Sequence, residues 1–262
     1  MEAAEYAKMA RIQDEHWWFA VKRQLAQVIL MRHGAAGGRR RVLEIGCGTG
    51  AMISTLGAYG RVVGMDLYAP ALEHVRGADR LVGDALSLPV ADGAVDLVAC
   101  FDLLYHRNVP QVDRAVAEIA RVLAPGGHVL ITDSASPALY GRHDAAHHGA
   151  RRFHKGDLQR QLVDAGLSIV HASYFHTAVF PLVAISRIGG RWLRQLAGTG
   201  EVSTRGHSQL RPTPVWLSAV IGALYRIEIP LAARIGLPFG VSVVVLARGA
   251  DAETASGPRD AS

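Results

Sequence analysis

Apolar residues recur along the chain with two different periods, which predict strands and helices in alternation. Residues 42–45, 95–101 and 128–133 are short apolar runs rich in β-branched residues, as in the buried strands of a parallel sheet. Residues 110–123 instead place apolar side chains three and four positions apart, which predicts an amphipathic helix. That helix should stop at residues 125–127, where a proline and two glycines combine a helix end with a turn.

Strand and helix patterns alternate from residue 41 to residue 133, which favours an α/β fold. Parallel strands need crossover helices, so the sheet should be Rossmann-like and mostly parallel, with helices on both faces. Further along, residues 155–165 predict a helix, and residues 167–175 and 241–247 predict two more strands. Ligands of such folds bind at the carboxyl ends of the strands, so functional residues should gather there.

The pattern divides the chain into five parts. A helical lead with a dense aromatic cluster precedes the alternating core. A long stretch before the last strand holds two apolar helical segments, 178–196 and 215–235, joined by a polar link over 198–211. The expected parts are an N-terminal helical lid (1–38), a core (39–176), a helical insertion (177–238), the last strand of the core (239–249) and a disordered tail (250–262).

The apolar insertion has two interpretations. Its helices could complete the core as a cap or form the face of a homodimer, or they could line a pocket for a lipophilic substrate such as a prenyl, polyketide or lipid chain. Contact of residues 178–235 with a membrane surface also stays open. The longest apolar windows fall well short of the ~20 residues that a transmembrane helix needs, so no transmembrane segment is predicted.

Composition narrows the function classes. The chain has 262 residues, half of them apolar, which suits one α/β domain with an elaboration. The net charge of +5 comes from short arginine clusters rather than a basic stripe with interleaved aromatics, so nucleic acid is not the expected partner. Two cysteines do not make a disulfide framework, and the N-terminus lacks the pattern of a signal peptide. A cytoplasmic protein is the default expectation.

A glycine loop follows the first strand and carries the candidate chemistry. Gly46, Gly48 and Gly50 let the backbone turn sharply and approach a ligand, and Glu44 precedes the turn. Asp66 ends the next predicted strand, where a carboxylate can accept from both hydroxyls of a ribose. The spacing G-x-G-x-G with a preceding acid argues against the pyrophosphate site of a dinucleotide-dependent oxidoreductase, which uses G-x-G-x-x-G. It suits a nucleoside that carries a positive group and no phosphate.

Five motifs occur in order along the chain: VLEIGCGTG (42–50), GMD (64–66), GDALSLP (83–89), DGAVDLVACFDLLYH (92–106) and RVLAPGGHVLITD (121–133). Together they resemble the class I S-adenosylmethionine-dependent methyltransferases, of the small-molecule, type 11-like kind. The resemblance covers roughly residues 6 to 175. It implies a seven-stranded sheet closed by an antiparallel strand, S-adenosyl-L-methionine as cofactor, and methyl transfer as the reaction.

The resemblance also implies a role for each position of the cofactor site. Asp66 would accept from the ribose hydroxyls, and Leu67 would pack on the adenine. Asp84 would accept from the adenine amino group, and the amide of Ala85 would face a ring nitrogen. Phe101 would border the methionine arm. The residues expected along the methionine and ribose portions are Glu44, Gly46, Cys47 and Gly48.

The aromatic cluster near the N-terminus has two interpretations. By resemblance, Trp18 would cover the cofactor as a lid, and Arg23 would pair with its carboxylate as a charged fork. Alternatively, Trp17, Trp18 and Phe19 simply dock their helix onto the sheet.

His106 is the candidate general base. It ends the segment FDLLYH, which reaches over the active-site mouth in relatives, and a neutral imidazole there could take a proton from a substrate hydroxyl or amine. The alternative is a histidine that caps its loop through a bond to the backbone. A carbon or an already deprotonated oxygen as acceptor would make the role of His106 purely positional.

Residues 134–153 predict a loop rich in Ser, His, Arg and Gly. Within it, Asp144 could orient a histidine, and His147 or His148 could replace the histidine that relatives carry at the position of Gly149. A metal site at these histidines is not expected, because no Cys or Glu joins them at useful spacing.

Three functions other than small-molecule methylation stay open. The first is the dinucleotide-dependent oxidoreductase that the glycine spacing and Glu44 argue against. Another is a methyltransferase fold used as a non-methylating cyclase or a scaffold. The third is a nucleic-acid or protein methyltransferase, which the sequence after the fourth strand disfavours, because it lacks an Asn-Pro-Pro-Tyr-type motif.

Overall fold

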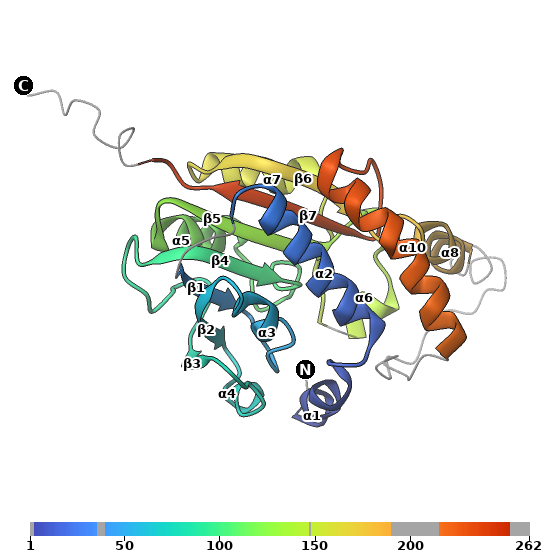
Figure 1. Cartoon of the computed structure of the whole chain (residues 1–262), viewed down its shortest axis with the longest axis horizontal. Helices are drawn as coiled ribbons and strands as arrows, with labels where there is room; N and C mark the ends of the chain where they lie inside the picture. The colour runs from blue at the N-terminus through green and yellow to red at the C-terminus, as the bar shows by residue number, and fades with distance from the viewer. Residues whose placement is uncertain (1–2, 36–39, 147, 190–214, 252–262) are drawn as a thin grey trace, which may run out of the picture.

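A seven-stranded sheet forms the centre of the computed structural model, which describes residues 3–35, 40–146, 148–189 and 215–251 (Figure 1). Its strands are β1 (Arg40–Ile45), β2 (Gly60–Asp66), β3 (Asp79–Val82), β4 (Val95–Phe101), β5 (Leu123–Ser134), β6 (Ser168–Phe175) and β7 (Ser242–Arg248). They lie in the order β3-β2-β1-β4-β5-β7-β6. Only β7 runs antiparallel to its neighbours among the described strands. The predicted Rossmann-like fold is confirmed.

Helices cover both faces of this sheet. One face carries α2 (Trp17–Arg32), α3 (Ile53–Leu56) and α10 (Val215–Arg234), and the other carries α5 (Val112–Val122) and α7 (Lys155–Asp164). The shorter segments are α1 (Ala3–Ile12), α4 (Ala69–Leu72), the 3₁₀ turn η1 (Pro137–Leu139), α6 (Arg142–Ala146), α8 (Phe180–Ala184) and the π-helical η2 (Ile185–Gly189).

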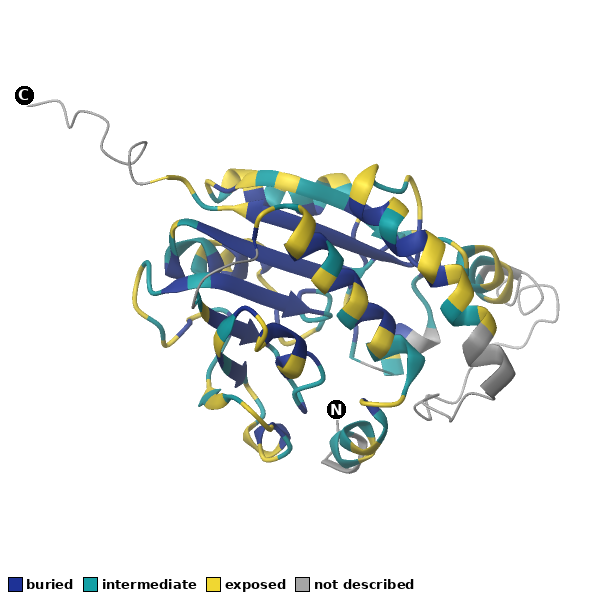
Figure 2. Cartoon of the chain, viewed as in Figure 1, coloured by how far each residue is buried: buried dark blue, intermediate teal, exposed yellow. Residues whose placement is uncertain are grey.

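The central strands are buried on both faces, as Figure 2 shows. Along β4, Leu97 and Ala99 point into the core under α2 and α10, whereas Val98 and Cys100 point into the core under α5. Side chains alternate between faces with a period of two, and both faces are apolar. This is why the strand appears in the sequence as a continuous apolar run.

The strand order reverses between β1 and β4. The chain builds outward from β1 through β2 to β3, then returns to add β4 on the other side of β1. The loops after β1 and β4 therefore separate and leave a crevice at the carboxyl ends of these strands, which is where folds of this class bind ligands.

Two details differ from the predicted pattern. The turn expected at residues 125–127 lies within β5 instead, because the ladder to β4 shifts register between Val95 and Leu97 and the extra residues form a bulge. The predicted loop over 134–153 contains η1 and the short helix α6. Residues 190–214, which include the polar link at 198–211, and most of the predicted tail lie outside the described residues.

The helix α10 is attached to the core by polar contacts as well as apolar ones. Glu228 accepts hydrogen bonds from the amides of Thr177 and Ala178, just after β6 (2.7 and 3.0 Å). Near the end of α10, the rings of His171 and His33 hydrogen-bond to the carbonyl oxygens of residues 232 and 233. With Tyr225 and Ile229 also buried, α10 completes the hydrophobic core on the α2 face.

Candidate active site

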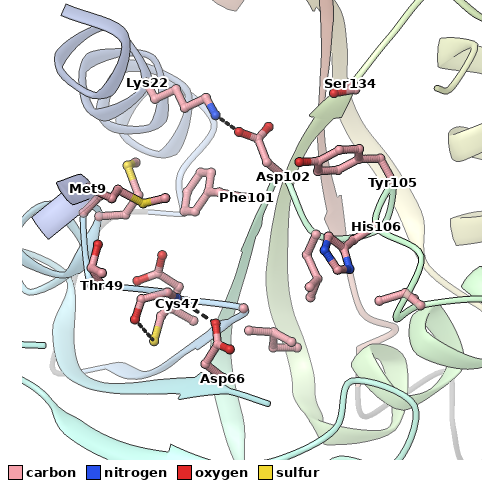
Figure 3. Close-up of a pocket in the computed structure, with 18 of the residues that line it drawn as sticks. Met9, Lys22, Cys47, Thr49, Asp66, Phe101, Asp102, Tyr105, His106 and Ser134 are labelled. Atoms are coloured by element: carbon pink, nitrogen blue, oxygen red, sulfur yellow. Dashed lines mark hydrogen bonds and ion pairs between the residues drawn. The ribbon is translucent and has the colours of Figure 1, made fainter. Parts of the chain in front are cut away.

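A cavity of about 640 Å³ lies at the carboxyl ends of the strands (Figure 3). It reaches from the ends of β1 and β2, past the end of β4, to residues of α8 and η2. Among the residues proposed from the sequence, it is lined by Trp18, Glu44, Gly46, Cys47, Gly48, Asp66, Leu67, Asp84, Ala85, Phe101 and His106, and Arg23 is absent from its walls.

The glycine loop is tied to the neighbouring strand. The amides of Gly46 and Cys47 both donate to the carbonyl oxygen of Met65 (2.8 and 2.9 Å). Gly46 has a φ of +72°, and a Cβ there would lie 2.9 Å from the side chain of Leu103, so this glycine permits close packing. Gly48 has a φ of +54°, yet a Cβ there would meet only Tyr6, at 4.0 Å. Gly48 therefore faces the open cavity.

The thiol of Cys47 sits in this loop without a disulfide partner. Burial raises the pKa of Cys47, and the nearby carboxylates of Glu44 and Asp66 raise it further. A thiol held in its protonated form is a poor nucleophile, so Cys47 serves as a small side chain beside the cavity.

Asp66 and Asp84 present carboxylate oxygens at the ends of two neighbouring strands. Asp66 accepts from the amides of Gly48 (2.8 Å) and Tyr68 (2.9 Å), one on each oxygen. A carboxylate oxygen has two lone pairs, so each can still accept from a ligand hydroxyl. Asp84 accepts from the amide of Leu86 (2.9 Å) as a turn residue and also lines the cavity.

Glu44 is suited to a cationic ligand. Its side chain is only 2% exposed, and Oε2 has no hydrogen-bond partner among the described residues. Burial, and then the negative charge of Asp66, raise its pKa to about 8. A buried oxygen without a partner is costly, and a positive group in the cavity would offset that cost. The sulfonium and ammonium groups of S-adenosylmethionine fit this requirement.

Glu44 should make the stability of the ligand-free protein depend on pH. An unfolded chain ionises Glu44 near its ordinary pKa of 4.5, whereas the folded protein keeps it protonated up to a pKa of about 8. Glu44 therefore stabilises the folded protein fully below pH 4.5. This stabilisation is lost as the pH rises to 8, and the free energy of unfolding falls by on the order of 2–5 kcal/mol. Urea unfolding of the wild type and Glu44→Gln between about pH 5 and pH 8 measures this loss. Parallel pH dependences for the two proteins would contradict it.

Lys22 is a site residue that the sequence reasoning missed. Its ammonium pairs with the carboxylate of Asp102 and lies 4.9 Å from the centre of the Trp18 ring. Burial lowers the pKa of Lys22, and the charge of Asp133 opposes this change. Asp133 is itself fully buried, and burial raises its pKa to about 7 although amides including those of Ser134 and Tyr105 donate to it. Trp18 and Lys22 are four residues apart on one helix, which was the available signal.

Arg23 does not have the position expected of it. Its guanidinium donates to the carbonyl oxygens of Gln13, Asp14 and Ala51 and so ties α1 and α2 to the glycine loop. Arg23 does not line the cavity, and Lys22 supplies the buried cation on this wall. The ligand-free geometry therefore does not support the fork between Arg23 and a ligand carboxylate, which stays a prediction.

The aromatic residues at the start of α2 have different surroundings. Trp18 stacks on the ring of His176 (centroids 4.3 Å apart, 11° between planes) and lines the cavity. Trp17 stacks against Tyr225 of α10, with centroids 6.1 Å apart. Both tryptophans thus border the cavity, and Trp17 also docks the helix on α10.

His106 lines the cavity but is bonded to its own loop. Its Nδ1 accepts a hydrogen bond from the amide of Asn108 (3.1 Å). Burial, followed by nearby positive charges including His148 and Arg107, lowers the pKa of His106 to about 4. The ring is therefore neutral with its proton on Nε2, so that this nitrogen donates. This geometry favours the alternative of a histidine that caps its loop through a backbone bond, and the general-base role stays a prediction.

Asp144 orients arginines rather than a histidine. It is 2% exposed and pairs with Arg152 (2.6 Å) and Arg187 (2.8 Å), and the amide of Gly141 also donates to it. Burial alone would raise the pKa of Asp144, but the hydrogen bonds and charges of the two arginines hold it below its ordinary value. The ring of His148 lies 5.7 Å from that of His106, and His147 is outside the described residues.

Comparison with known proteins supports one family. A family model described as a methyltransferase domain matches residues 43–131. Malonyl-[acyl-carrier protein] O-methyltransferase of Erwinia pyrifoliae is 30% identical over 242 residues, covering 87% of this chain and 89% of that protein. Demethylmenaquinone methyltransferase of Staphylococcus haemolyticus is 33% identical over 111 residues, 38% of this chain and 45% of that protein.

A solved structure has the same fold. The structure of the complex between the Trm112 methyltransferase activator and a methyltransferase of Haloferax volcanii aligns with a TM-score of 0.58 over 94% of this chain and 95% of its own, at 19% identity. The glycine loop, the acidic strand ends and the matched relatives agree. This chain belongs to the class I S-adenosylmethionine-dependent methyltransferases, and its cofactor is S-adenosyl-L-methionine.

Proposed function

We propose that this methyltransferase transfers its methyl group to a small, lipophilic acceptor. The observation that carries the proposal is the continuity of the cavity. A single space reaches from Asp66 and Glu44, at the cofactor end, past His106 to Val183 and Arg187 of the insertion. An acceptor bound at the far end would meet the methyl donor inside the protein and away from bulk water.

We assign separate roles in methyl transfer to the residues that line the cavity. When bound, S-adenosylmethionine supplies an electrophilic methyl group on a sulfonium. We assign Asp66 to the ribose, Asp84 and Ala85 to the adenine, and Glu44 to the positive end of the cofactor. Phe101 and Trp18 exclude water from the same region. Methyl transfer needs little covalent help beyond this holding and alignment.

The acceptors named for the relatives guide the choice of substrates to test. One relative is named for a malonyl group on acyl-carrier protein, and another for demethylmenaquinone. We therefore propose a panel of lipophilic acids, phenols and quinones, with O-, N- and C-methylation all to be scored.

The proposal is tested with S-adenosylmethionine that carries an isotopically labelled methyl group. Label should appear in at least one member of the panel, together with stoichiometric S-adenosylhomocysteine. Binding of the cofactor without transfer to any member would favour the non-methylating cyclase or scaffold. Stabilisation by NAD instead of S-adenosylmethionine in a thermal-shift assay would favour an oxidoreductase.

The outer surface of the insertion suggests where other molecules bind. Among the described residues, no helix is both long and apolar enough to cross a membrane. Even so, α10 exposes a row of apolar side chains at helical spacing, which we propose as a contact for a membrane surface or a second copy of the chain in a cytoplasmic enzyme. Vesicle flotation and analytical ultracentrifugation distinguish these two. The row comprises Val220, Leu224, Ile227 and Leu231 of α10, and Ile235 directly after it.

A further inference from the structure

We infer that the apolar row of α10 docks on the surface of a membrane that contains anionic lipids. This inference rests on the proposed function and chooses one of the two partners suggested there for the outer surface of the insertion. Two observations carry it. The helix α10 is apolar on both of its sides, and the charged side chains around the row are cations.

The first observation concerns the two sides of α10. A helix on the surface of a protein normally buries an apolar side and turns a polar side to water. On its inner side, α10 buries Tyr225 and Ile229 in the core that it shares with α2. On its outer side, the five residues of the apolar row are 41–73% exposed (Figure 2). They follow one another every three or four positions, so they form a continuous stripe roughly 22 Å long.

The two long helices on the opposite face of the sheet are ordinary in this respect. On α5, Val116 and Ile119 are buried, whereas Asp113 and Arg114 are exposed. On α7, the exposed residues include Arg160. The stripe is thus particular to α10 among these three helices. Single exposed apolar residues are common in proteins, but a contiguous set of them indicates a surface that contacts something.

The second observation is that the helices of this surface lack exposed acidic side chains. Of the 23 acidic residues in the chain, only Glu228 lies in α2 or α10. It is buried, and its carboxylate is bound to two backbone amides just after β6. No carboxylate within these two helices therefore faces the solvent.

The exposed charges on the same two helices are positive. Arg226 and Arg234 lie on α10 next to residues of the row, and Arg32 ends α2. The ends of the two helices lie together, because the ring of His33 hydrogen-bonds to a carbonyl oxygen at the end of α10 (3.1 Å). Figure 1 shows α2 and α10 side by side on this face. An apolar stripe with arginines beside it matches a bilayer, in which anionic headgroups cover an apolar interior.

A second copy of the chain matches this surface less well. A two-fold dimer brings the same surface of both subunits together. The arginines of one subunit would then approach those of the other, and neither pair of helices has an exposed carboxylate to compensate them. Like charges that meet in an interface oppose association, whereas anionic headgroups attract the arginines.

The segment that docks also forms part of the cavity. In the same insertion, Val183 lines the cavity, and Leu182 and Ile185 are exposed. The insertion therefore presents apolar side chains both to the cavity and to the outside. Docking of α10 would bring this insertion, with its cavity wall, to a phase in which lipophilic molecules concentrate.

Vesicle flotation tests the proposal with the full chain and without turnover. The probes are vesicles of phosphatidylcholine alone and of phosphatidylcholine mixed with phosphatidylglycerol. The wild type should float with the mixed vesicles at low salt, and high salt should weaken this binding because it screens the arginines. Absence of binding to the mixed vesicles, or equal binding to both kinds, would overturn the proposal.

Variants separate the apolar and the charged contributions. The double variant Leu224→Ser and Ile227→Ser should bind the mixed vesicles at least about 10-fold more weakly, because it removes apolar area that enters the bilayer. Arg226→Gln and Arg234→Gln should lose roughly 5-fold for each arginine, and the salt dependence should fall. All four side chains are exposed, so these variants should fold, which urea unfolding verifies.

A matched control lies on the other face of the sheet. The double variant Val163→Ser and Arg160→Gln removes an exposed apolar side chain and an exposed cation from α7, and it should bind vesicles as the wild type does. A loss in this control as large as in the variants of α10 would overturn the assignment of the surface.

A fluorescent label identifies the side of the protein that contacts the membrane. The native Cys47 and Cys100 are buried, so a cysteine at an exposed position takes the label selectively. An environment-sensitive fluorophore on Ile227→Cys should shift its emission to shorter wavelength with the mixed vesicles, whereas the same label on Val163→Cys should not. No shift on Ile227→Cys, or an equal shift on both, would contradict docking through α10.

Analytical ultracentrifugation tests the alternative partner. A dimer that dissociates in the double variant Leu224→Ser and Ile227→Ser would make the row a subunit interface and overturn the proposal. Vesicle binding needs neither cofactor nor acceptor, so its failure would leave the proposed methyl transfer in place. Failure of S-adenosylmethionine to bind would instead refute the proposed function and leave the result with vesicles unaffected.

Discussion

A valine at Gly48 is expected to abolish binding of S-adenosylmethionine in a protein that still folds. A side chain added here would enter the cavity, since only Tyr6 lies within reach of its Cβ, at 4.0 Å. The backbone of Gly48 has a φ of +54°, which costs a β-branched residue about 1–3 kcal/mol. That cost is a fraction of the 5–15 kcal/mol by which domains are stable, so the fold should survive.

A matched variant separates the lost cavity space from the backbone strain. Gly93 has a φ of +63°, and a Cβ there would meet nothing within 4 Å, in a turn that does not line the cavity. Gly93→Val should lose a similar amount of stability in urea unfolding and keep full affinity for the cofactor by calorimetry. Normal binding by Gly48→Val would mean that the loop does not approach the ligand.

Replacing Asp66 by alanine should weaken binding of S-adenosylmethionine and S-adenosylhomocysteine by roughly 10- to 150-fold. The carboxylate is the expected acceptor for the ribose hydroxyls, and a hydrogen bond to a charged group contributes about 1.5–3 kcal/mol. The variant also leaves the amides of Gly48 and Tyr68 without their acceptor, which loosens the loop. Isothermal titration calorimetry measures the change in both ligands.

Two further variants make the Asp66 result specific. Asp66→Asn keeps one side-chain oxygen as an acceptor and should retain part of the affinity. Asp79→Ala removes a surface carboxylate paired with Arg61 near the start of β3 and should bind normally. If Asp66→Ala binds both ligands with unchanged affinity, Asp66 does not bind the ribose, whatever the result for the other variants.

The sequence predicted the cofactor end of the cavity better than the acceptor end, and the reason is locality. Glu44, Gly46 and Gly48 belong to one strand and its following turn, so their spacing in the chain is also their arrangement in space. Asp66 and Asp84 end strands that simply follow in parallel order. Such residues can be predicted from the sequence, because residues of one turn are neighbours in space as well. The carboxyl ends of adjacent parallel strands also lie at one edge of the sheet, whatever the rest of the chain does.

The acceptor end, and the wall that Lys22 forms at the cofactor end, depend on contacts between distant segments. Lys22 pairs with Asp102 across 80 positions, and Arg187 reaches Asp144 across 43. Nothing in the spacing of such residues indicates that they meet. Lys22 lines the cavity and Arg23 does not for a simpler reason. Consecutive helical residues point about 100° apart, so only one of the two can face the cavity.

The position of the antiparallel strand β7 in the sheet also depends on long-range contacts that the sequence pattern does not reveal. A last strand over 241–247 was predicted, but its place between β5 and β6 depends on the whole sheet. The sequence also predicted that the insertion is apolar. It did not predict that α10 packs on α2 and β6 through Glu228 and Tyr225.

The division of the cavity between two stretches of chain bears on how new substrates are acquired. The cofactor end is built almost entirely from residues before Asp102, whereas Val183 and Arg187 come from the insertion, which has its own anchor in Glu228 of α10. A segment from after β6 to before β7 could therefore be grafted from a relative while the methyl-donor site stays intact. Such a graft needs to preserve the contacts of α10 with α2, with the amides after β6 and with the rings of His33 and His171. Selection for a different acceptor can then act on this one cassette, because the two halves of the reaction are encoded separately.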